Sequence, residues 1–224
     1  MLAGRRVPMI TLKVDPVDPD MKAIRAAADA IRAGELVIFP TETVYGLAAD
    51  AFNEDAVKAV YDAKGRSGHQ PLPVQVGSLD DVFKAAEFMS PDARRLAEMY
   101  WPGPLTLILT KAAALPSVVT CGGETVGVRI PDHPVALALT KEVGSPIIAT
   151  SANATGRPAP KTAVEAIREV GEKVSVVLDA GPSRLGTAST VVDMTVLPPK
   201  ILRRGSLRVE DIRKVLGEVE EQLE

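Results

Sequence analysis

Residues 39–66 read FPTETVYGLAADAFNEDAVKAVYDAKGR. The stretch begins at the end of an apolar strand, LVIFP at 36–40, passes through small polar residues and continues into a helix. Asn53 is a favourable helix cap, and Gly65 allows the left-handed conformation in which many helices end. A strand followed by polar residues and then by a helix is typical of an α/β fold, in which ligands bind at the ends of strands.

The rest of the chain repeats this alternation, although several strands follow one another without a helix between them. The apolar patterns and turn residues predict strands at 9–15, 36–40, 72–76, 105–110, 125–130, 146–150, 174–179, 189–194 and 200–203. They predict helices at 18–35, 53–64, 78–88, 90–100, 133–144, 162–171 and 209–223. Asp18 is the expected cap of the first helix. The pattern therefore predicts an α/β fold with a mixed parallel and antiparallel sheet and flanking helices.

We expect one domain, because no internal repeat or low-complexity linker divides the 224 residues. Residues 1–17 are expected to form an N-terminal extension with the first strand, and residues 18–207 the main domain. Residues 208–224 are expected to form a C-terminal helix packed on the same domain.

The composition narrows the class of protein. With 46% hydrophobic and 25% charged residues, the chain has the composition of an ordinary globular protein. The net charge of −3 provides no whole-molecule field for nucleic acid, and 4% aromatic residues argue against a stacking platform for single strands. The single cysteine, Cys121, excludes an internal disulfide, and no apolar run reaches the length of a membrane span. We therefore expect a cytoplasmic protein with no membrane attachment.

His69 and His133 lack cysteine or carboxylate partners at metal-ligand spacing, so no metal site is expected.

Two groups of residues in the opening stretch could bind a ligand. Thr41, Thr43 and Tyr45 supply donors and acceptors for a small polar molecule, but a turn whose hydroxyls satisfy the local backbone explains them equally simply. Lys64 and Arg66 could meet phosphate or carboxylate, but cations also stabilise the C-terminus of a helix. Taken separately, each group leaves both interpretations open.

A second strand ends in the same kind of chemistry. Thr150, Ser151 and Asn153 close the strand at 146–150 and precede a loop that contains glycine and proline, although the spacing is not that of a P-loop. Polar residues also occur at two further strand edges, GTASTVVD at 186–193 and ILRRGS at 201–206. Four such sites together favour a ligand crevice over four independent turns.

Seven short motifs occur in the order found in one known family. PTETVYGL, KGR, WPGPLT, VRIPDHP, TSAN, STVVD and ILRRG lie between residues 20 and 207, and the ordered set resembles the YrdC-like threonylcarbamoyl-AMP synthases. The resemblance implies a twisted mixed sheet folded around a basic concavity (the YrdC-like fold), in the short, single-domain bacterial form. It implies an L-threonylcarbamoyladenylate synthase, a nucleotidyltransferase that condenses L-threonine, bicarbonate and ATP and releases pyrophosphate. Mg²⁺ would accompany ATP. A partner transferase complex would then modify tRNA, by moving the threonylcarbamoyl group to an adenosine next to the anticodon.

The resemblance also implies roles for individual residues. The expected catalytic residues match the family's Lys-x-Arg and Ser-x-Asn pairs and are Lys64, Arg66, Ser151 and Asn153. The residues expected to bind ATP are Lys64, Arg66, Gln70, Thr125, Thr150, Ser151, Asn153 and Arg203. The residues expected to bind L-threonine are Thr41, Thr43, Tyr45, Arg129 and Ser189. Arg129 would meet the carboxylate, and Glu42 is a conceivable acceptor for a proton of the ammonium group.

The sequence departs from the family pattern at Ser67, Gln70, Gln75 and Ala159, where proline, asparagine, histidine and serine are common. The resemblance therefore constrains contacts with the amino acid less closely than contacts with the nucleotide. One alternative is an enzyme of the same fold that makes a different carbamoyl-adenylate. Another is a non-catalytic module that binds tRNA or double-stranded RNA in the basic concavity.

Overall fold

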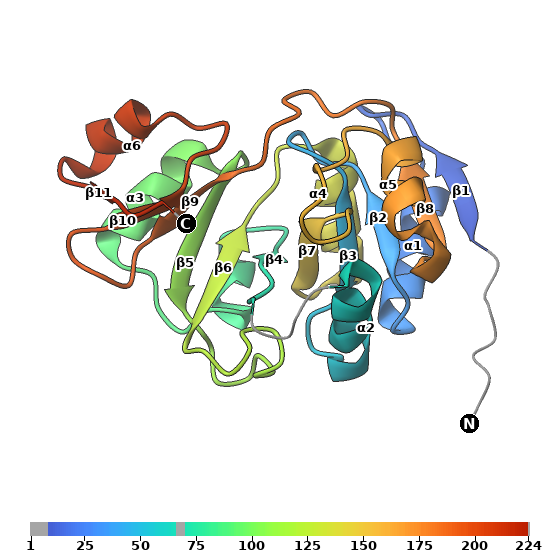
Figure 1. Cartoon of the computed structure of the whole chain (residues 1–224), viewed down its shortest axis with the longest axis horizontal. Helices are drawn as coiled ribbons and strands as arrows, with labels where there is room; N and C mark the ends of the chain where they lie inside the picture. Colours follow the sequence, from blue (N-terminus) through green and yellow to red (C-terminus); the bar gives the residue numbers. More distant parts are fainter. Residues whose placement is uncertain (1–8, 66–69, 224) are drawn as a thin grey trace.

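Strands from the whole length of the chain join in one sheet (Figure 1). The computed structural model describes residues 9–65 and 70–223, and over these ranges the sheet has eleven strands in the order β1-β8-β2-β3-β7-β4-β6-β5-β9-β10-β11. The strands are β1 (Ile10–Lys13), β2 (Val37–Phe39), β3 (Gly46–Asp50), β4 (Val74–Gln75), β5 (Leu105–Thr110), β6 (Thr125–Arg129), β7 (Ile147–Ser151), β8 (Val176–Asp179), β9 (Thr190–Asp193), β10 (Lys200–Arg203) and β11 (Glu220–Glu221).

Both kinds of strand pairing occur in this sheet. β8 pairs in parallel with β1 and β2, and the pairs β4–β6, β5–β9 and β10–β11 are also parallel. β3 is antiparallel to both of its neighbours, β2 and β7, and the pairs β4–β7, β5–β6 and β9–β10 are antiparallel. The predicted mixed sheet is therefore confirmed.

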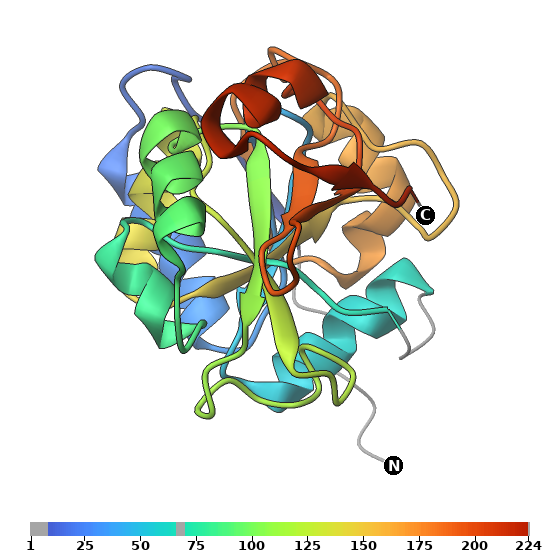
Figure 2. The same cartoon turned by 90° about the vertical axis from the view of Figure 1, so that its left-hand side faces the viewer.

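Helices cover both faces of the sheet (Figure 2). Their apolar sides form two core clusters. Successive residues of β2 point to opposite faces, as expected for a strand buried on both sides. Val37 and Phe39 pack in the cluster that contains α1 and α4, whereas Ile38 packs in the cluster that contains α2, α3 and α5. The helices are α1 (Met21–Arg32), α2 (Glu54–Lys64), α3 (Pro91–Tyr100), α4 (Pro134–Val143), α5 (Ala163–Val170) and α6 (Val209–Leu216), with 3₁₀ segments η1 (Asp80–Lys84) and η2 (Gly171–Lys173).

The strand β3 is one that the sequence pattern does not predict. Its residues, Gly-Leu-Ala-Ala-Asp, are mostly of types that are depleted in strands. The strand nevertheless lies between β2 and β7, where small side chains allow close packing. A Cβ at Gly46 would lie 2.6 Å from Cε1 of the Phe39 ring, so the register of β3 against β2 requires glycine at this position. Tertiary packing therefore outweighs local propensity here.

Several helix boundaries differ from the predicted ones. The prediction that Asp18 caps the first helix is wrong, because the carboxylate of Asp20 accepts the hydrogen bond from the Lys22 amide. The predicted helix at 78–88 is the shorter η1, and the predicted helix at 209–223 ends at Leu216. Gly217, with φ of 77°, ends α6 and directs the chain into β11.

Both ends of the described chain belong to the same sheet. β1 and β11 are its two edge strands, and α6 packs on α3 through the hydroxyl of Tyr100, which donates to the Asp211 carbonyl (2.9 Å). The boundaries predicted at residues 17 and 207 stay a prediction, and residues 1–8 and 224 lie outside the described ranges.

A histidine begins α4, directly after the strand β6. The Val135 amide donates to His133 Nδ1 (3.2 Å), which requires that nitrogen to carry no proton. Burial lowers the pKa of His133 below its ordinary value of 6.5, against an opposing effect of the Glu42 and Asp132 carboxylates. The neutral ring therefore caps the helix at pH 7.

We expect the His133 cap to make the fold less stable in mild acid. Because the folded pKa lies below 6.5, the stabilisation is present above that pH and is lost as the pH falls towards the lowered pKa. His133→Asn keeps a capping side chain that does not titrate. The thermal midpoint of the native chain should therefore fall more between pH 7 and pH 5 than that of the variant, as measured by circular dichroism. Equal decreases in the two proteins would contradict this role.

Candidate active site

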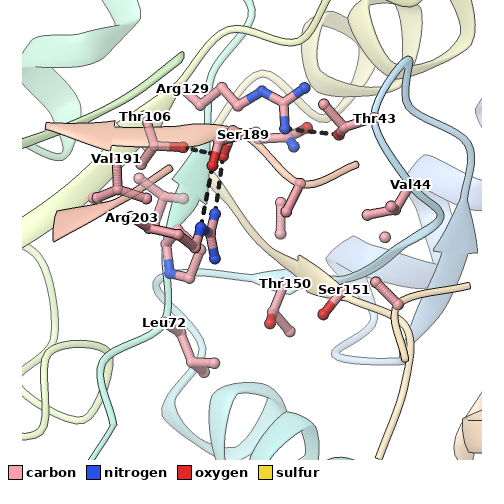
Figure 3. A pocket seen from close by; sticks show the side chains of 18 of the residues that line it. Thr43, Val44, Leu72, Thr106, Arg129, Thr150, Ser151, Ser189, Val191 and Arg203 are labelled. Atoms are coloured by element: carbon pink, nitrogen blue, oxygen red, sulfur yellow. Dashed lines mark hydrogen bonds between the residues drawn. The ribbon is translucent and has the colours of Figure 1, made fainter. Parts of the chain in front are cut away.

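A cavity of about 370 Å³ opens where the ends of several strands meet (Figure 3). Most of the sequence-predicted residues line it: Thr41, Thr43, Lys64, Gln70, Arg129, Thr150, Ser151, Asn153, Ser189 and Arg203. Its described lining contains three cationic residues and neither aspartate nor glutamate. This composition agrees with the predicted basic concavity.

Thr41 closes the turn between β2 and β3. Its hydroxyl donates to the Val44 carbonyl (2.6 Å), and the amides of Thr43 and Val44 both lie 3.3 Å from Thr41 Oγ1. The Thr43 hydroxyl is 2.8 Å from Thr41 Oγ1 and acts as the donor, because the Thr41 proton is already used. The turn interpretation is therefore right for Thr41, while its hydrogen bonds orient Thr43.

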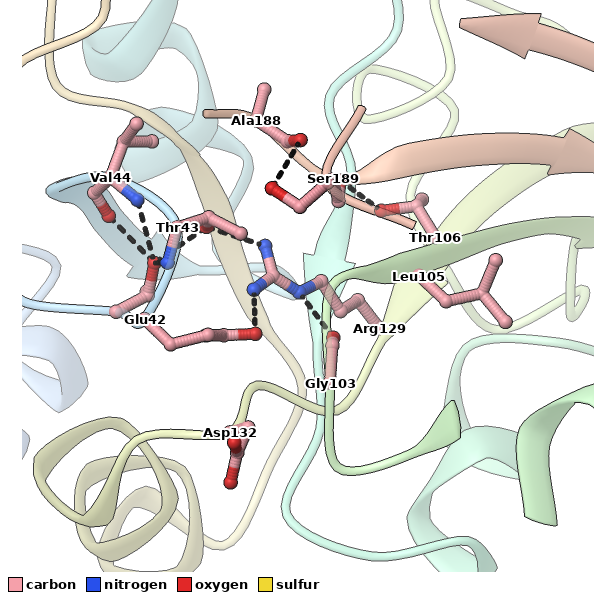
Figure 4. A network of polar contacts seen from close by, with 12 residues as sticks. Glu42, Thr43, Val44, Gly103, Leu105, Thr106, Arg129, Asp132, Ala188 and Ser189 are labelled. Carbon is pink, nitrogen blue, oxygen red and sulfur yellow. Dashed lines mark hydrogen bonds and ion pairs between the residues drawn. The ribbon is translucent and has the colours of Figure 1, made fainter. Parts of the chain in front are cut away.

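Arg129 connects this turn to two other segments (Figure 4). Its Nη1 donates to Thr43 Oγ1 (3.0 Å), and its Nε donates to the Gly103 carbonyl (3.0 Å). Its Nη2 forms an ion pair with Glu42 Oε1 at 2.5 Å. The side chains of Glu42 and Arg129 are only 1% and 8% exposed, so the ion pair is almost entirely removed from water.

Lys64 is buried at the C-terminal end of α2. Its ammonium donates to the carbonyls of Ser151 (2.5 Å) and Asn153 (2.7 Å), and its own carbonyl accepts from the Thr155 amide (2.8 Å). Lysine is rarely buried, and a favourable position at a helix end does not require burial. The structure therefore places the Lys64 side chain against the segment that follows β7, at the wall of the cavity.

Two buried acceptors in the cavity wall lack partners among the described residues. Asn153 Nδ2 donates to the carbonyls of Ala154 (3.1 Å) and Arg157 (2.7 Å), whereas Asn153 Oδ1 accepts no hydrogen bond within the described ranges. Gln75 Oε1 is in the same situation. Because most buried polar atoms are hydrogen-bonded, these two oxygens are positions at which donors of a ligand would be satisfied.

Ser189 is held between β5 and β10. Its hydroxyl lies 2.8 Å from Thr106 Oγ1 and accepts from Arg203 Nη2 (3.1 Å), while Arg203 Nε donates to the Ser189 carbonyl (3.1 Å). The backbone of Gly205 passes directly alongside: a Cβ there would lie 2.3–2.4 Å from backbone atoms of residues 188–190. Glycine at 205 therefore permits the contact that fixes Ser189.

Two predicted site residues do not line the cavity, and a third lies outside the described residues. Tyr45 does not line the cavity: its side chain is fully buried, its hydroxyl donates to the Gly181 carbonyl (2.6 Å), and burial raises its pKa. Thr125 begins β6 and is also absent from the cavity lining. Arg66 lies outside the described residues, as do Ser67 and His69. The predicted ligand contacts of these residues stay predictions.

Some lining residues were missed by the sequence reasoning, notably Thr106 and Gly127. Thr106 is a hydroxyl on an otherwise apolar strand, and it faces the cavity together with Ile108. Gly127 interrupts a β-branched strand, which often marks a close approach of another group. A Cβ at Gly127 would be 3.2 Å from Thr106 Cγ2, so its absence keeps the floor of the cavity open.

Residues 9–65 and 70–223 contain neither a metal-binding cluster nor a membrane-spanning helix. No three His, Cys, Asp or Glu residues come together there in a way that could hold a metal ion. No described helix is both long enough and apolar enough to cross a membrane.

The mixed α/β sheet carries a cavity lined by cationic and hydroxyl-bearing residues, a composition suited to a polar, anionic ligand. The family model Sua5_yciO_yrdC, described as "Telomere recombination", matches residues 29–205. The chain belongs to this family. It is 45% identical over 196 residues to the threonylcarbamoyl-AMP synthase of Pyrococcus abyssi, covering 88% of this chain and 58% of that protein. It is 42% identical over 210 residues to a putative threonylcarbamoyl-AMP synthase of Mycobacterium tuberculosis, covering 93% and 96% of the respective chains. The chain thus spans little more than half of the archaeal relative.

Solved structures agree with the sequence relatives. P. abyssi Sua5 in complex with L-threonine matches with a TM-score of 0.93 and 42% identity, over 96% of this chain and 63% of that one. Escherichia coli YciO matches with a TM-score of 0.83 and 22% identity, over 91% of this chain and 99% of that one, and supports the fold alone.

We expect Gly205→Ala to destabilise the fold, because the added methyl group would overlap backbone atoms that cannot move independently. The expected cost is about 2 kcal/mol or more, which corresponds to a decrease of roughly 4–8 °C in Tm for a chain of this size. Thermal unfolding followed by circular dichroism measures this.

Gly123→Ala is the matched control. Its Cβ would meet one atom within 4 Å, the Thr120 carbonyl oxygen at 3.1 Å. A Gly205→Ala protein with the Tm of this control would show that the contact between Gly205 and residues 188–190 is not tight in solution.

Proposed function

We propose that this chain is an L-threonylcarbamoyladenylate synthase, which converts L-threonine, bicarbonate and ATP to threonylcarbamoyl-AMP and pyrophosphate. The observation that carries the proposal is that one cavity brings a buried arginine and its hydroxyl neighbours together with a buried lysine and the Ser-x-Asn segment. The names of the relatives, and the complex of P. abyssi Sua5 with L-threonine, support the same reaction.

The proposed site for the amino acid surrounds Arg129. Two of the five guanidinium N–H donors lack a partner among the described residues, and these would bind the threonine carboxylate. Thr43 and Ser189 would contact the rest of the amino acid, with the unpartnered Gln75 Oε1 as a further acceptor. Thr41 and Tyr45 would hold this wall in place from behind.

The proposed nucleotide site lies along α2 and the segment after β7. Lys64, Ser151 and Asn153 would contact ATP from there, and Lys64 would stabilise negative charge on the phosphates. Arg66, Gln70, Thr125, Thr150 and Arg203 complete the proposed set. ATP would enter as its Mg²⁺ complex, because the described cavity lining offers no carboxylate to hold a metal ion by itself.

The reaction requires no nucleophilic side chain. The amine of threonine and bicarbonate form a carbamate with loss of water, and a carbamate oxygen then attacks the α-phosphorus and displaces pyrophosphate. The protein would position the three substrates and stabilise the developing charge, and both tasks suit hydroxyls and cations held rigidly by the fold. The adenylate would then pass, in the cytoplasm, to a partner transferase that modifies an adenosine next to the tRNA anticodon.

We expect Lys64→Ala and Ser151→Ala each to lower kcat/KM for pyrophosphate release about 100-fold, the effect typical of losing one group that stabilises transition-state charge. The assay contains ATP, Mg²⁺, bicarbonate and single amino acids, and release should require L-threonine. Lys58→Ala, an exposed lysine on the same helix, should retain the native rate.

Absence of release with every amino acid would exclude the synthase. Salt-sensitive binding of tRNA without ATP consumption would then favour the RNA-binding alternative. Release with a different amino acid would indicate another carbamoyl-adenylate, with Gln75 and Ala159 as the first residues to exchange.

A further inference from the structure

The buried carboxylate of Glu42 lies next to the proposed amino-acid site but outside its lining. Arg129 lines the cavity and Glu42 does not, so the carboxylate influences the cavity through Arg129 (Figure 4). Burying an ion pair is weak evidence for stabilisation, because apolar replacements of such pairs are often equally stable. The Glu42–Arg129 pair therefore calls for an explanation other than stability.

Glu42, Thr43 and Gly103 together fix the orientation of the guanidinium. They accept from Nη2, Nη1 and Nε respectively, which are spread around the planar group. Each terminal nitrogen retains one N–H with no partner among the described residues. A guanidinium held in this way has a fixed plane, and its two remaining donors point in fixed directions, so that it can recognise an acceptor by geometry.

Glu42 also contributes a negative charge that is itself incompletely satisfied. Its Oε2 is buried and has no hydrogen-bond partner among the described residues. The neighbouring groups are His133, which is neutral at pH 7, and the half-exposed Asp132–Arg184 pair at 2.6 Å. The nearest full charge that Glu42 offsets is therefore that of Arg129.

We propose that Glu42 is a positioning residue that orients Arg129 and offsets its charge, so that Arg129 selects a carboxylate by geometry and not every small anion by charge. This inference rests on the proposed function, in which Arg129 receives the carboxylate of the amino acid. Bicarbonate, phosphate and pyrophosphate are all present during the reaction. An uncompensated buried guanidinium would attract each of them, because burial strengthens electrostatic interactions.

The test uses Glu42→Gln in the full chain, since glutamine keeps the shape and one acceptor but removes the charge. We expect the KM for L-threonine to rise at least tenfold while the KM for ATP stays within twofold. We also expect sulfate, used as the probe anion, to bind the variant at least tenfold more tightly than the native chain in calorimetry, and L-threonine to displace it. Asp132→Asn removes a nearby exposed carboxylate and should leave the sulfate affinity within twofold of native.

The sulfate comparison does not depend on turnover. Equal sulfate affinity in the native chain and Glu42→Gln would overturn the positioning role, even if the native chain proves to be the synthase. Equal increases in the KM values for L-threonine and ATP, together with a lowered Tm of Glu42→Gln, would also overturn the positioning role, because they would indicate a purely structural effect. The native chain could fail to release pyrophosphate while Glu42→Gln still binds sulfate more tightly. That result would exclude the proposed function, but it would support the offset of the Arg129 charge by Glu42.

Glu42→Asp serves if Glu42→Gln does not fold. Aspartate keeps the charge but is one methylene shorter. The KM for L-threonine should therefore rise while sulfate binding stays at the native level. Tight sulfate binding by Glu42→Asp would contradict the proposal.

Discussion

The buried guanidinium of Arg129 accounts for the way in which three distant segments meet. β6 supplies the arginine, the turn between β2 and β3 supplies Glu42 and Thr43, and the turn before β5 supplies the Gly103 carbonyl. A buried cation needs acceptors in several directions, and removing one partner of such a pair typically costs about 3–5 kcal/mol. Arg129 therefore links the three segments that meet at this wall of the cavity.

The hydroxyl groups around the cavity differ in the partners of their hydrogen bonds. Thr41 uses its proton and its lone pairs within its own turn, so that its contribution is local. Thr43 and Ser189 each accept from an arginine, which sets the direction of their own protons. The turn and the cavity wall are therefore one structure, because the hydrogen bonds of Thr41 orient the Thr43 hydroxyl, which lines the cavity.

How well the sequence predicts a structural feature depends on how far apart in the chain the interacting residues lie. The cap at Asn53 and the left-handed stop at Gly65 depend on neighbours within a few residues, and both are confirmed. The ordered motifs predicted the family, and ten of the predicted site residues line the cavity. β3 was missed because Gly46 and its alanines suit a strand only when Phe39 and β7 lie against them. The Thr106–Ser189 contact was missed for the same reason, since its partners are 83 residues apart.

The two buried cations of the wall are held by different kinds of acceptor, and this difference has a consequence for the chemistry. Arg129 faces the carboxylate of Glu42, whereas Lys64 donates to the backbone carbonyls of Ser151 and Asn153. A triphosphate is attracted chiefly by charge, and a carboxylate can be recognised by geometry. A wall arranged in this way would direct ATP towards Lys64 and the amino acid towards Arg129. Three substrates that each carry a negatively charged group would then be sorted before any bond forms between them.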